Sequence, residues 1–447
     1  MNKLSIIAAL QAACLLVTGS AVCYHPERDA VQIAAAADYE ETSGDFQFVR
    51  AEDNRIRITG YSGKAETVSF PAEIAGRQVF CIGDGENPVL RGDSQQRVSA
   101  VRFPANPVMI ADLAFSQCTG LESLQLPDTV SSLGTGCFSG CSALESAELP
   151  RELEYIRPQC FENCIRLRTV RMPEKLITVA LEAFRGCRAL ETVRIPANTR
   201  LISGAFSGCS ALRQIDLGKG VTFSGAGIFK DCTALKTVWL PNSVITVPER
   251  TFSGCTMLSE VRFGRKTARI QEAAFEGCKS LRTVTLPPAF SALSAFAFSY
   301  CTNLEQLTVK STDCLFPDAA DTTVCNGKQD GKAFYHGVIC GYDDSTVQKF
   351  AAQFGLDFVS LGPAPEYYAA GDVDNDSQVG LSDAQAVLRE YTDVMAGKKP
   401  AFSELQSLAA DVNLDDETGI DDAQLILMYY TETAVAGRSI RWEDLPL

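Results

Sequence analysis

Hydrophobic positions recur along the middle of the chain with a period of 23 residues, with one step of 22. Each copy places a Phe three residues before a Cys and a Leu three residues after it, and alternating apolar and polar residues follow. This alternation predicts a half-buried strand in every copy. Nine cysteines mark the copies: Cys118, Cys141, Cys164, Cys187, Cys209, Cys232, Cys255, Cys278 and Cys301.

The sequence of the predicted strand in each copy follows the pattern Leu-x-x-Leu-x-Leu, as in Leu121 to Leu126. This pattern is the signature of leucine-rich repeats. The Phe-Ser-Gly-Cys variant, together with a Leu-Pro exit, resembles the BspA-like class over residues 95–310. The resemblance implies an α/β-type leucine-rich-repeat solenoid, with a parallel strand ladder and a short irregular convex side. One coil cannot close a core alone, so we expect its apolar side chains to stack on those of neighbouring coils.

Departures from the period divide the rest of the chain into further segments. Residues 46–94 are predicted to cap the first coil, and residues 311–362 to cap the last one, with a helix within Ser345 to Gly355. The remaining predicted segments are a signal peptide (1–21), a spacer (22–45), a linker (363–370), a C-terminal module (371–435) and a tail (436–447).

The N-terminus predicts export. Lys3 precedes an apolar run from Leu4 to Val17, and the small residues that follow suit cleavage after Ala21. A lipoprotein anchor at Cys23 is the alternative interpretation. No other segment of the sequence is predicted to span a membrane, so we expect a secreted, extracellular protein.

Two acidic stretches near the C-terminus repeat each other at an offset of 39 residues. Oxygen ligands at positions 1, 3, 5 and 12, with a backbone carbonyl at position 7, are typical of a calcium-binding loop. Apolar residues at helical spacing follow each loop, so the duplication covers a whole loop–helix unit. The predicted ligands are Asp372, Asp374, Asp376, Gln378 (carbonyl) and Asp383 in the first loop, and Asp411, Asn413, Asp415, Glu417 (carbonyl) and Asp422 in the second.

The first loop follows Pro363 and Pro365 closely, which leaves no space for an entering helix. Paired loop–helix units of this kind resemble the type I-like dockerin module of cellulosomal proteins. The resemblance implies two Ca²⁺ ions and calcium-dependent docking to a cohesin domain of a scaffoldin. It also implies cohesin contacts at Leu381, Ser382, Arg389, Ile420 and Asp421. The sequence departs from the family at position 6, where Ser377 and Asp416 replace the usual Gly.

Outward strand positions of the repeats are predicted to align in columns that turn basic near the middle of the body. One of the two tryptophans of the chain lies among these cations, a composition expected of a binding hot spot. The alternative is a solvated face with one incidental aromatic residue. The candidate ligand-binding residues are Arg171, Arg194, Arg213, Lys236, Trp239 and Arg262.

The charge and the histidine content limit the functions that the sequence allows. The net charge is −15, of which residues 371–447 contribute −11 through 16 acidic and 5 basic side chains, so the body offers no electrostatic footprint for nucleic acid. The only histidines, His25 and His336, have no nucleophile in a recognisable constellation. Glycoside hydrolysis by a pair of carboxylates remains an alternative function, because Glu122, Glu145 and Glu148 could be neighbours on adjacent strands.

The 17 cysteines admit two interpretations. The repeated ones occupy one equivalent inward position, which favours small buried thiols over disulfides. Cys137 and Cys160 each replace an Ala before the Phe and are expected on adjacent coils. In an exported chain, a disulfide among Cys314, Cys325 and Cys340 in the end cap is the remaining candidate.

The sequence therefore predicts a secreted, non-catalytic binding or adhesion protein. Its repeat surface would bind a protein or a polysaccharide, and its C-terminal module would dock to a cohesin within a cellulosome. The alternative is a dockerin-borne enzyme that acts on polysaccharide or peptide. That alternative requires two outward carboxylates about 5 to 10 Å apart in a concave pocket.

Overall fold

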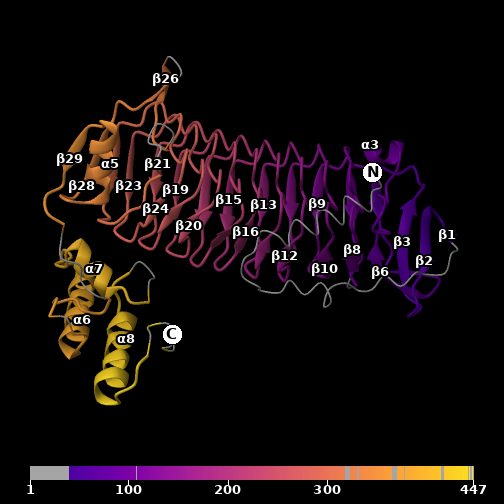
Figure 1. Cartoon of the computed structure of the whole chain (residues 1–447). Helices are drawn as coiled ribbons and strands as arrows, with labels where there is room; N and C mark the ends of the chain where they lie inside the picture. Colours follow the sequence, from indigo (N-terminus) through magenta and orange to yellow (C-terminus); the bar gives the residue numbers. More distant parts are fainter. Residues whose placement is uncertain are drawn as a thin grey trace.

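The computed structural model describes residues 40–447, except 107, 318–322, 330–331, 365–369, 377, 414–416, 441, 443–444 and 446–447. The predicted signal peptide, Cys23 and His25 lie outside the described residues. The chain forms a long solenoid body, and three helices lie beside the C-terminal end of this body (Figure 1). None of the helices in the described part is long and apolar enough to cross a membrane.

An antiparallel hairpin closes the N-terminal end of the body. Strands β1 (Glu41–Ser43) and β2 (Phe46–Arg50) pair antiparallel, and β2 pairs in the same way with β3 (Ile56–Tyr61). The short strand β5 (Glu73–Ile74) and the helix α3 (Asp93–Arg97) complete the cap. Because β3 is buried along its whole length, the hairpin seals the exposed face of the first coil.

The alternating segments of the repeats form a ladder of parallel strands, as predicted, which is divided into three sheets. We call this ladder the first ladder. Its strands are β4 (Thr67–Ser69), β7 (Ala100–Arg102), β9 (Ser123–Gln125), β11 (Ser146–Glu148), β13 (Thr169–Arg171), β15 (Thr192–Ile195), β17 (Gln214–Leu217), β19 (Thr237–Trp239), β21 (Glu260–Arg262), β23 (Thr283–Leu286), β25 (Gln306–Val309), β28 (Val338–Gly341) and β29 (Phe358–Ser360).

The prediction of an irregular convex side is wrong, because a second ladder of parallel strands runs along the body. Most of its strands contain only two or three residues, too few for alternation to appear in the sequence. The described residues between α3 and β25 contain strands and turns but no helix. The second ladder comprises β6 (Arg77–Ile82), β8 (Val108–Ile110), β10 (Val130–Leu133), β12 (Tyr155–Ile156), β14 (Thr178–Val179), β16 (Arg200–Ile202), β18 (Thr222–Ser224), β20 (Thr246–Val247), β22 (Arg269–Ile270) and β24 (Ala292–Leu293).

The repeated Phe residues form a continuous aromatic stack between the two ladders. From Phe115 to Phe298 the nine rings are fully buried, and the centroids of consecutive rings are 5.2 to 5.6 Å apart. The repeated Leu residues are buried beside them. Each coil therefore buries its apolar side chains against its neighbours, as expected for a solenoid.

The repeated cysteines satisfy buried backbone carbonyls. Each thiol from Cys141 to Cys301 lies 3.1 to 3.3 Å from the carbonyl oxygen of the Phe in the preceding coil and donates to it. Burial raises the pKa of Cys209 to about 12, which keeps this donor protonated. An unpaired buried carbonyl is costly, so the thiol does more than fill space.

The other cysteines are also free thiols in the described part of the chain. Cys137 and Cys160 lie on adjacent coils, as predicted, with their sulfur atoms 3.4 Å apart. No disulfide joins Cys314, Cys325 and Cys340, all of which are described. The predicted disulfide of the end cap is therefore not formed.

The C-terminal cap continues the first ladder and adds a hairpin and a helix. Strands β26 (Gly327–Gln329) and β27 (Lys332–Phe334) pair antiparallel. The helix α5 (Thr346–Phe354) confirms the predicted helical stretch. The Ser345 side chain accepts a hydrogen bond from Gln348 N at the start of the helix, and Gly355 ends it in the left-handed conformation.

The C-terminal module has a small core of its own. It contains α6 (Leu381–Met395), α7 (Glu404–Ala410), α8 (Ile420–Tyr430) and the π-helical turn η1 (Thr431–Val435). Leu445 and Trp442, from the segment 436–447 predicted to be a tail, pack on this core. Helix α7 was not predicted, although the capping box formed by Ser403 and Gln406 is a sequence signal for its start.

Candidate binding surface and calcium loops

The first acidic loop brings three of its predicted ligands together. One carboxylate oxygen from each of Asp372, Asp374 and Asp376 lies within 4.8 Å of the others. The Asp372 side chain is buried, and the backbone N–H groups of Asp376 and Gln378 donate to carboxylates of the loop. The arrangement turns several hard oxygen donors toward one point, which suits a divalent cation.

Asp383, at position 12 of the same loop, stands outside this group of three. Its carboxylate is fully buried and accepts hydrogen bonds from the backbone N–H groups of Val373, Asp374 and Gly380. A carboxylate offers about four lone-pair positions, so one position is left for a cation. The residue therefore closes the loop onto the first turn of α6.

The second loop repeats this closure. Asp422 is fully buried and accepts from the backbone N–H groups of Val412, Asn413 and Gly419. The Asn413 amide donates to Asp421 Oδ2 at 2.7 Å, which links a predicted calcium ligand to a predicted cohesin contact. Asp415 and Asp416 lie outside the described residues, as does Ser377 in the first loop.

Burial of these carboxylates favours a cation. Desolvation raises the pKa of Asp422 to about 6 and also raises the pKa of Asp383. The side chains of Asp372 and Asp411 are buried as well. Four buried aspartates in so small a module carry an electrostatic cost that a bound Ca²⁺ would relieve, so the residues present fit the ion.

Packing of the C-terminal segment supports the first loop. Gly371, which precedes Asp372, has a φ of +85°, and a Cβ atom there would lie 2.7 Å from the Trp442 ring. Glycine is required at this position for both reasons. The Trp442 ring stacks on Tyr429 of α8, with their centroids 4.2 Å apart.

The predicted cohesin-contact residues lie exposed on the two duplicated helices. Leu381 and Ile420 are about half exposed and begin α6 and α8, and Ser382, Arg389 and Asp421 are exposed as well. Further exposed apolar residues of these helices were missed, among them Leu388 and Leu427. Each lies seven positions after Leu381 or Ile420, so helical spacing and the offset of 39 residues could have revealed them.

The outward side chains of adjacent strands in the first ladder align in a column, as predicted. Cα register pairs Gln125 with Glu148 and Glu148 with Arg171 across adjacent strands. Trp239 is paired in the same way with Arg262. The ladder therefore presents one side chain per coil in line along this face.

Trp239 is the most exposed aromatic side chain of this face, at 61%. The guanidinium of Arg262 lies 4.5 Å from the centroid of its ring. A cation over an indole face is favourable and holds the ring in place. Trp239 is therefore a pre-positioned aromatic side chain with most of its surface open to solvent.

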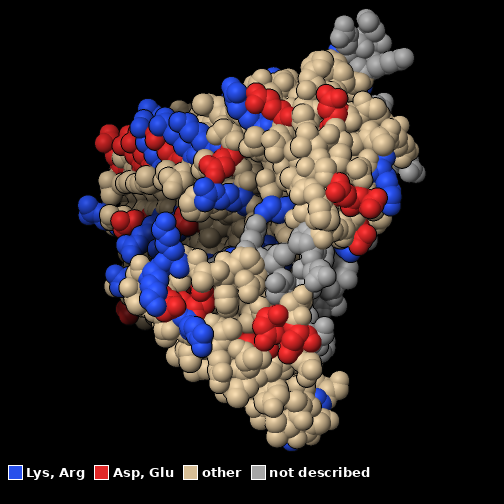
Figure 2. Space-filling view, turned by 90° about the vertical axis from the view of Figure 1, so that its left-hand side faces the viewer, with Lys and Arg blue, Asp and Glu red and all other residues tan. Residues whose placement is uncertain are grey.

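The candidate cations of this face differ in their partners. Arg194 lies 3.7 Å from Asp216, and Arg262 lies 2.7 Å from Glu260, so part of the positive charge is neutralised on the surface. Among the described residues, Arg171, Arg213 and Lys236 make no ion pair. Figure 2 shows Lys and Arg side chains gathered in a band with Asp and Glu beside them.

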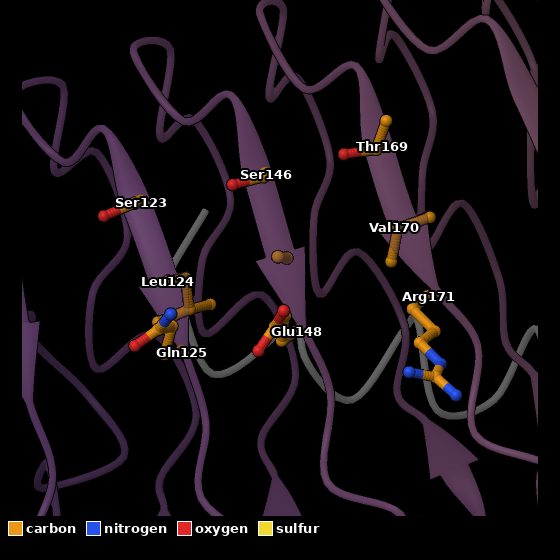
Figure 3. Close-up of a pocket in the computed structure, with 9 residues that line it drawn as sticks. Ser123, Leu124, Gln125, Ser146, Glu148, Thr169, Val170 and Arg171 are labelled. Atoms are coloured by element: carbon orange, nitrogen blue, oxygen red, sulfur yellow. The ribbon is translucent and has the colours of Figure 1, made fainter.

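Two shallow cavities lie on the first ladder. The first has a volume of about 250 Å³ and lies over β9, β11 and β13, where Gln125, Glu148 and Arg171 project from neighbouring strands (Figure 3). The second has a volume of about 330 Å³ and lies near β21 and β23. Each cavity contains a single carboxylate, Glu148 in the first and Glu260 in the second. Neither holds the carboxylate pair that the enzyme hypothesis requires.

In the described part of the chain, Arg265 connects the body to the module through two contacts. Arg265 follows β21, and its Nη1 atom donates to the backbone oxygen of Ser407 in α7 at 3.3 Å. The same nitrogen lies 3.7 Å from Asp411 Oδ2 in the second acidic loop. The hydrogen bond with Ser407 links residues 142 positions apart in the sequence.

Two parallel ladders built from coils of 22 to 23 residues around a buried Phe stack define a leucine-rich-repeat solenoid. Residues 94–213 and 198–305 match the family model described as BspA type leucine-rich repeat region. Residues 94–305 of the body are accordingly similar to BspA-type leucine-rich repeats. A comparison with the curated proteins finds no match.

Solved structures with similar chains include other leucine-rich-repeat proteins. A leucine-rich cell surface protein from Faecalibacterium prausnitzii A2-165 is 23% identical over 62% of this chain and 89% of its own, with a TM-score of 0.39. A leucine-rich-repeat protein from Bacteroides ovatus ATCC 8483 is 20% identical over 72% of this chain and 100% of its own, with a TM-score of 0.42.

Proposed function

We propose that this chain is an exported, non-catalytic binding protein with two separate attachment functions. The first ladder binds a protein or polysaccharide ligand through the column around Trp239. The C-terminal module binds two Ca²⁺ ions and docks to a cohesin domain of a scaffoldin. The bound ions would supply positive charge that orders both loops, and the chain's own residues would present the docking face.

The duplicated loop–helix unit carries the docking proposal. Both loops close onto a helix through a buried aspartate that accepts three backbone N–H groups. Both helices then expose apolar residues at equivalent positions, Leu381 and Leu388 on α6 and Ile420 and Leu427 on α8. Exposed apolar side chains that recur on both copies favour a partner-binding face.

Binding of the whole chain to a panel of cohesin domains tests the docking proposal. We expect binding in calcium and none in chelator. Replacing Leu381 and Ile420 together with Asp should weaken binding at least tenfold, because charges would be buried at the interface. The matched control is Met395→Asp, since Met395 is 71% exposed on α6, and the equivalent position of the second copy holds only the small Ala434. Equal binding by both variants would contradict the proposed face.

The ligand surface is tested by Trp239→Ala. We expect this variant to weaken binding of the body's ligand by about 30-fold, the effect of losing a hot-spot residue of about 2 kcal/mol. Its thermal midpoint should stay unchanged, because the ring is mostly exposed. Tyr155→Ala is the matched control, as Tyr155 is 43% exposed on the second ladder. Screening glycans and surface proteins with the wild-type chain identifies the ligand, and a large loss of stability in Trp239→Ala would show that the ring belongs to the core.

A further inference from the structure

Two cysteines of adjacent coils lie with their sulfur atoms 3.4 Å apart, and both side chains are fully buried. They are Cys137 and Cys160, which occupy the position directly before the repeated Phe. The other seven of the nine coils hold a different residue there: Ala114, Ala183, Ala205, Ile228, Thr251, Ala274 and Ala297. Cysteine therefore occurs at this position in two neighbouring coils and in none of the others.

The two coils are close enough for a covalent bond between these side chains. The N–H of Phe138 donates to the carbonyl oxygen of Cys160 at 2.9 Å, and the rings of Phe138 and Phe161 stack with their centroids 5.5 Å apart. A disulfide requires Cα atoms about 4.4 to 6.8 Å apart and sulfur atoms about 2.0 Å apart. The spacing of the coils lies within this range, so closing the bond requires a shift of the sulfur atoms and not of the backbone.

Hydrogen bonding distinguishes this pair from the repeated cysteines. Each repeated thiol from Cys141 to Cys301 donates to the carbonyl oxygen of a Phe, so its oxidation would remove a hydrogen bond from a buried acceptor. In the described part of the chain, the thiols of Cys137 and Cys160 contact only each other by hydrogen bonding. Oxidation of this pair therefore breaks no hydrogen bond to the backbone.

The pair lies beside the first of the two interruptions in the second ladder. One sheet ends at β10 and the next begins at β12, and each cysteine follows one of these strands by four residues. In the first ladder the same two coils are joined, because β9 pairs with β11. A bond between Cys137 and Cys160 would join the coils on the side where strand pairing is missing.

We propose that Cys137 and Cys160 form a disulfide in the exported chain, and that this bond joins the two coils beside the interruption. The inference rests on the export that the proposed function includes, because exported proteins fold where disulfides form and persist. The oxidant is a disulfide donor of that compartment.

The bond forms by two thiol–disulfide exchanges. One thiolate of the pair attacks a sulfur of the donor disulfide, which gives a mixed disulfide and releases one donor thiolate. The second thiolate of the pair then attacks the sulfur of the first, closes the bond and releases the other donor thiolate. The two protons lost by the pair go to the two donor thiolates, and the donor is reduced by the two electrons that the pair loses.

Burial determines when this exchange can occur. Both thiols are closed to solvent, and burial raises the pKa of the Cys137 thiol well above its usual range, so the folded chain provides neither access nor thiolate. The exchange must therefore precede the stacking of these two coils during folding. The finished bond is shielded from reductants for the same reason.

Peptide mapping of the refolded whole chain tests the proposal. The chain is refolded from denaturant in reduced and oxidised glutathione, alkylated, and digested without reductant. We expect the peptides of Cys137 and Cys160 to be linked and lighter by two hydrogens than the reduced pair. Dithiothreitol should break the link only when denaturant is added. Alkylated Cys137 and Cys160 in the refolded chain would overturn the proposal.

Thermal unfolding of a double variant gives a second measurement. Cys137→Ala with Cys160→Ala should fold, because five of the other coils hold Ala at this position. Refolding in reductant should lower the thermal midpoint of the wild-type chain by roughly 5 °C and leave that of the double variant unchanged, because the bond restricts the unfolded chain. The matched control is Cys187→Ala, which removes a buried thiol outside the pair and should respond to reductant as the wild-type chain does. An equal fall in the double variant would show that other cysteines form the stabilising bond.

These measurements separate the disulfide from the proposed function, because neither of them uses calcium, a cohesin or a ligand of the first ladder. Recovery of the chain from the culture medium tests export separately. A chain retained in the cell would contradict the proposed export and, with it, the proposed bond. Free thiols at both positions after refolding would overturn the disulfide and leave the proposed binding functions standing.

Discussion

Removing calcium from the whole chain is expected to unfold the C-terminal module and to leave the repeat body folded. The module has a small core, and four of its aspartates are buried, where a bound cation would relieve their mutual repulsion. The body owes its stability to the Phe stack and to two ladders that contain no ion site among the described residues. We therefore expect ion binding and folding to be coupled only in the module.

Far-UV circular dichroism reports this change directly. Helices α6 and α8 contain 15 and 11 residues, whereas α3 and α5 contain five and nine, so most of the helical signal comes from the module. We expect chelator to remove more than half of the signal at 222 nm. Asp374→Ala should act in the same direction. Asp393→Ala should leave the signal unchanged, because Asp393 is a partly exposed residue of α6 that pairs with Lys398. Full helicity in chelator would show that the module folds without the ion.

Phe206→Ala is expected to cause the largest loss of stability in the body. The Phe206 ring is fully buried between Phe184 and Phe229, with centroids 5.3 and 5.5 Å away. Replacing such a ring with Ala costs about 3 to 5 kcal/mol, because transfer energy and packing are lost together. For a body of this size the thermal midpoint should fall by roughly 10 °C.

The position of the substitution matters as well as its size. A solenoid transmits stability only between neighbouring coils, so a weakened central coil is expected to broaden or divide the thermal transition. Calorimetry of Phe206→Ala beside Trp239→Ala makes the comparison, since Trp239 is an aromatic residue of the same body but is 61% exposed. Equal stability of the two variants would show that the Phe stack does not hold the coils together.

The first ladder and the core were predictable from the sequence because they repeat. A single Phe or Cys says little about burial, but nine copies at one position define an inward column. The second ladder was not predictable. Strands such as Tyr155–Ile156 and Thr178–Val179 are too short to show alternation, and neighbouring coils provide their hydrogen bonds.

The thiol hydrogen bonds were missed for a different reason. The sequence shows that Cys recurs three residues after Phe, but the acceptor is the Phe carbonyl of the preceding coil, 25 or 26 residues away. Side-chain chemistry alone favours a small buried residue. The stacking of the coils is what makes a weak donor useful at this position.

The candidate calcium ligands were predictable from the sequence, but the residues that contact the two acidic loops were not. Loop spacing identified Asp372, Asp374 and Asp376, whose carboxylates do come together. The contact of Arg265 with the second loop depends on how the two parts of the chain pack, and no local pattern in the sequence records it. Trp442 and Leu445 pack in the module core, but they come from a segment that has no repeat or motif by which this could be predicted.

Calcium titration of the metal-free wild-type chain tests the central claim most directly. Two loops with oxygen ligands in equivalent positions should take up two ions per chain, with heat released or absorbed in each step and with recovery of the helical signal. Two ions bound, together with that recovery, is the predicted result. No heat beyond dilution, with the helical signal unchanged throughout the titration, would contradict the account.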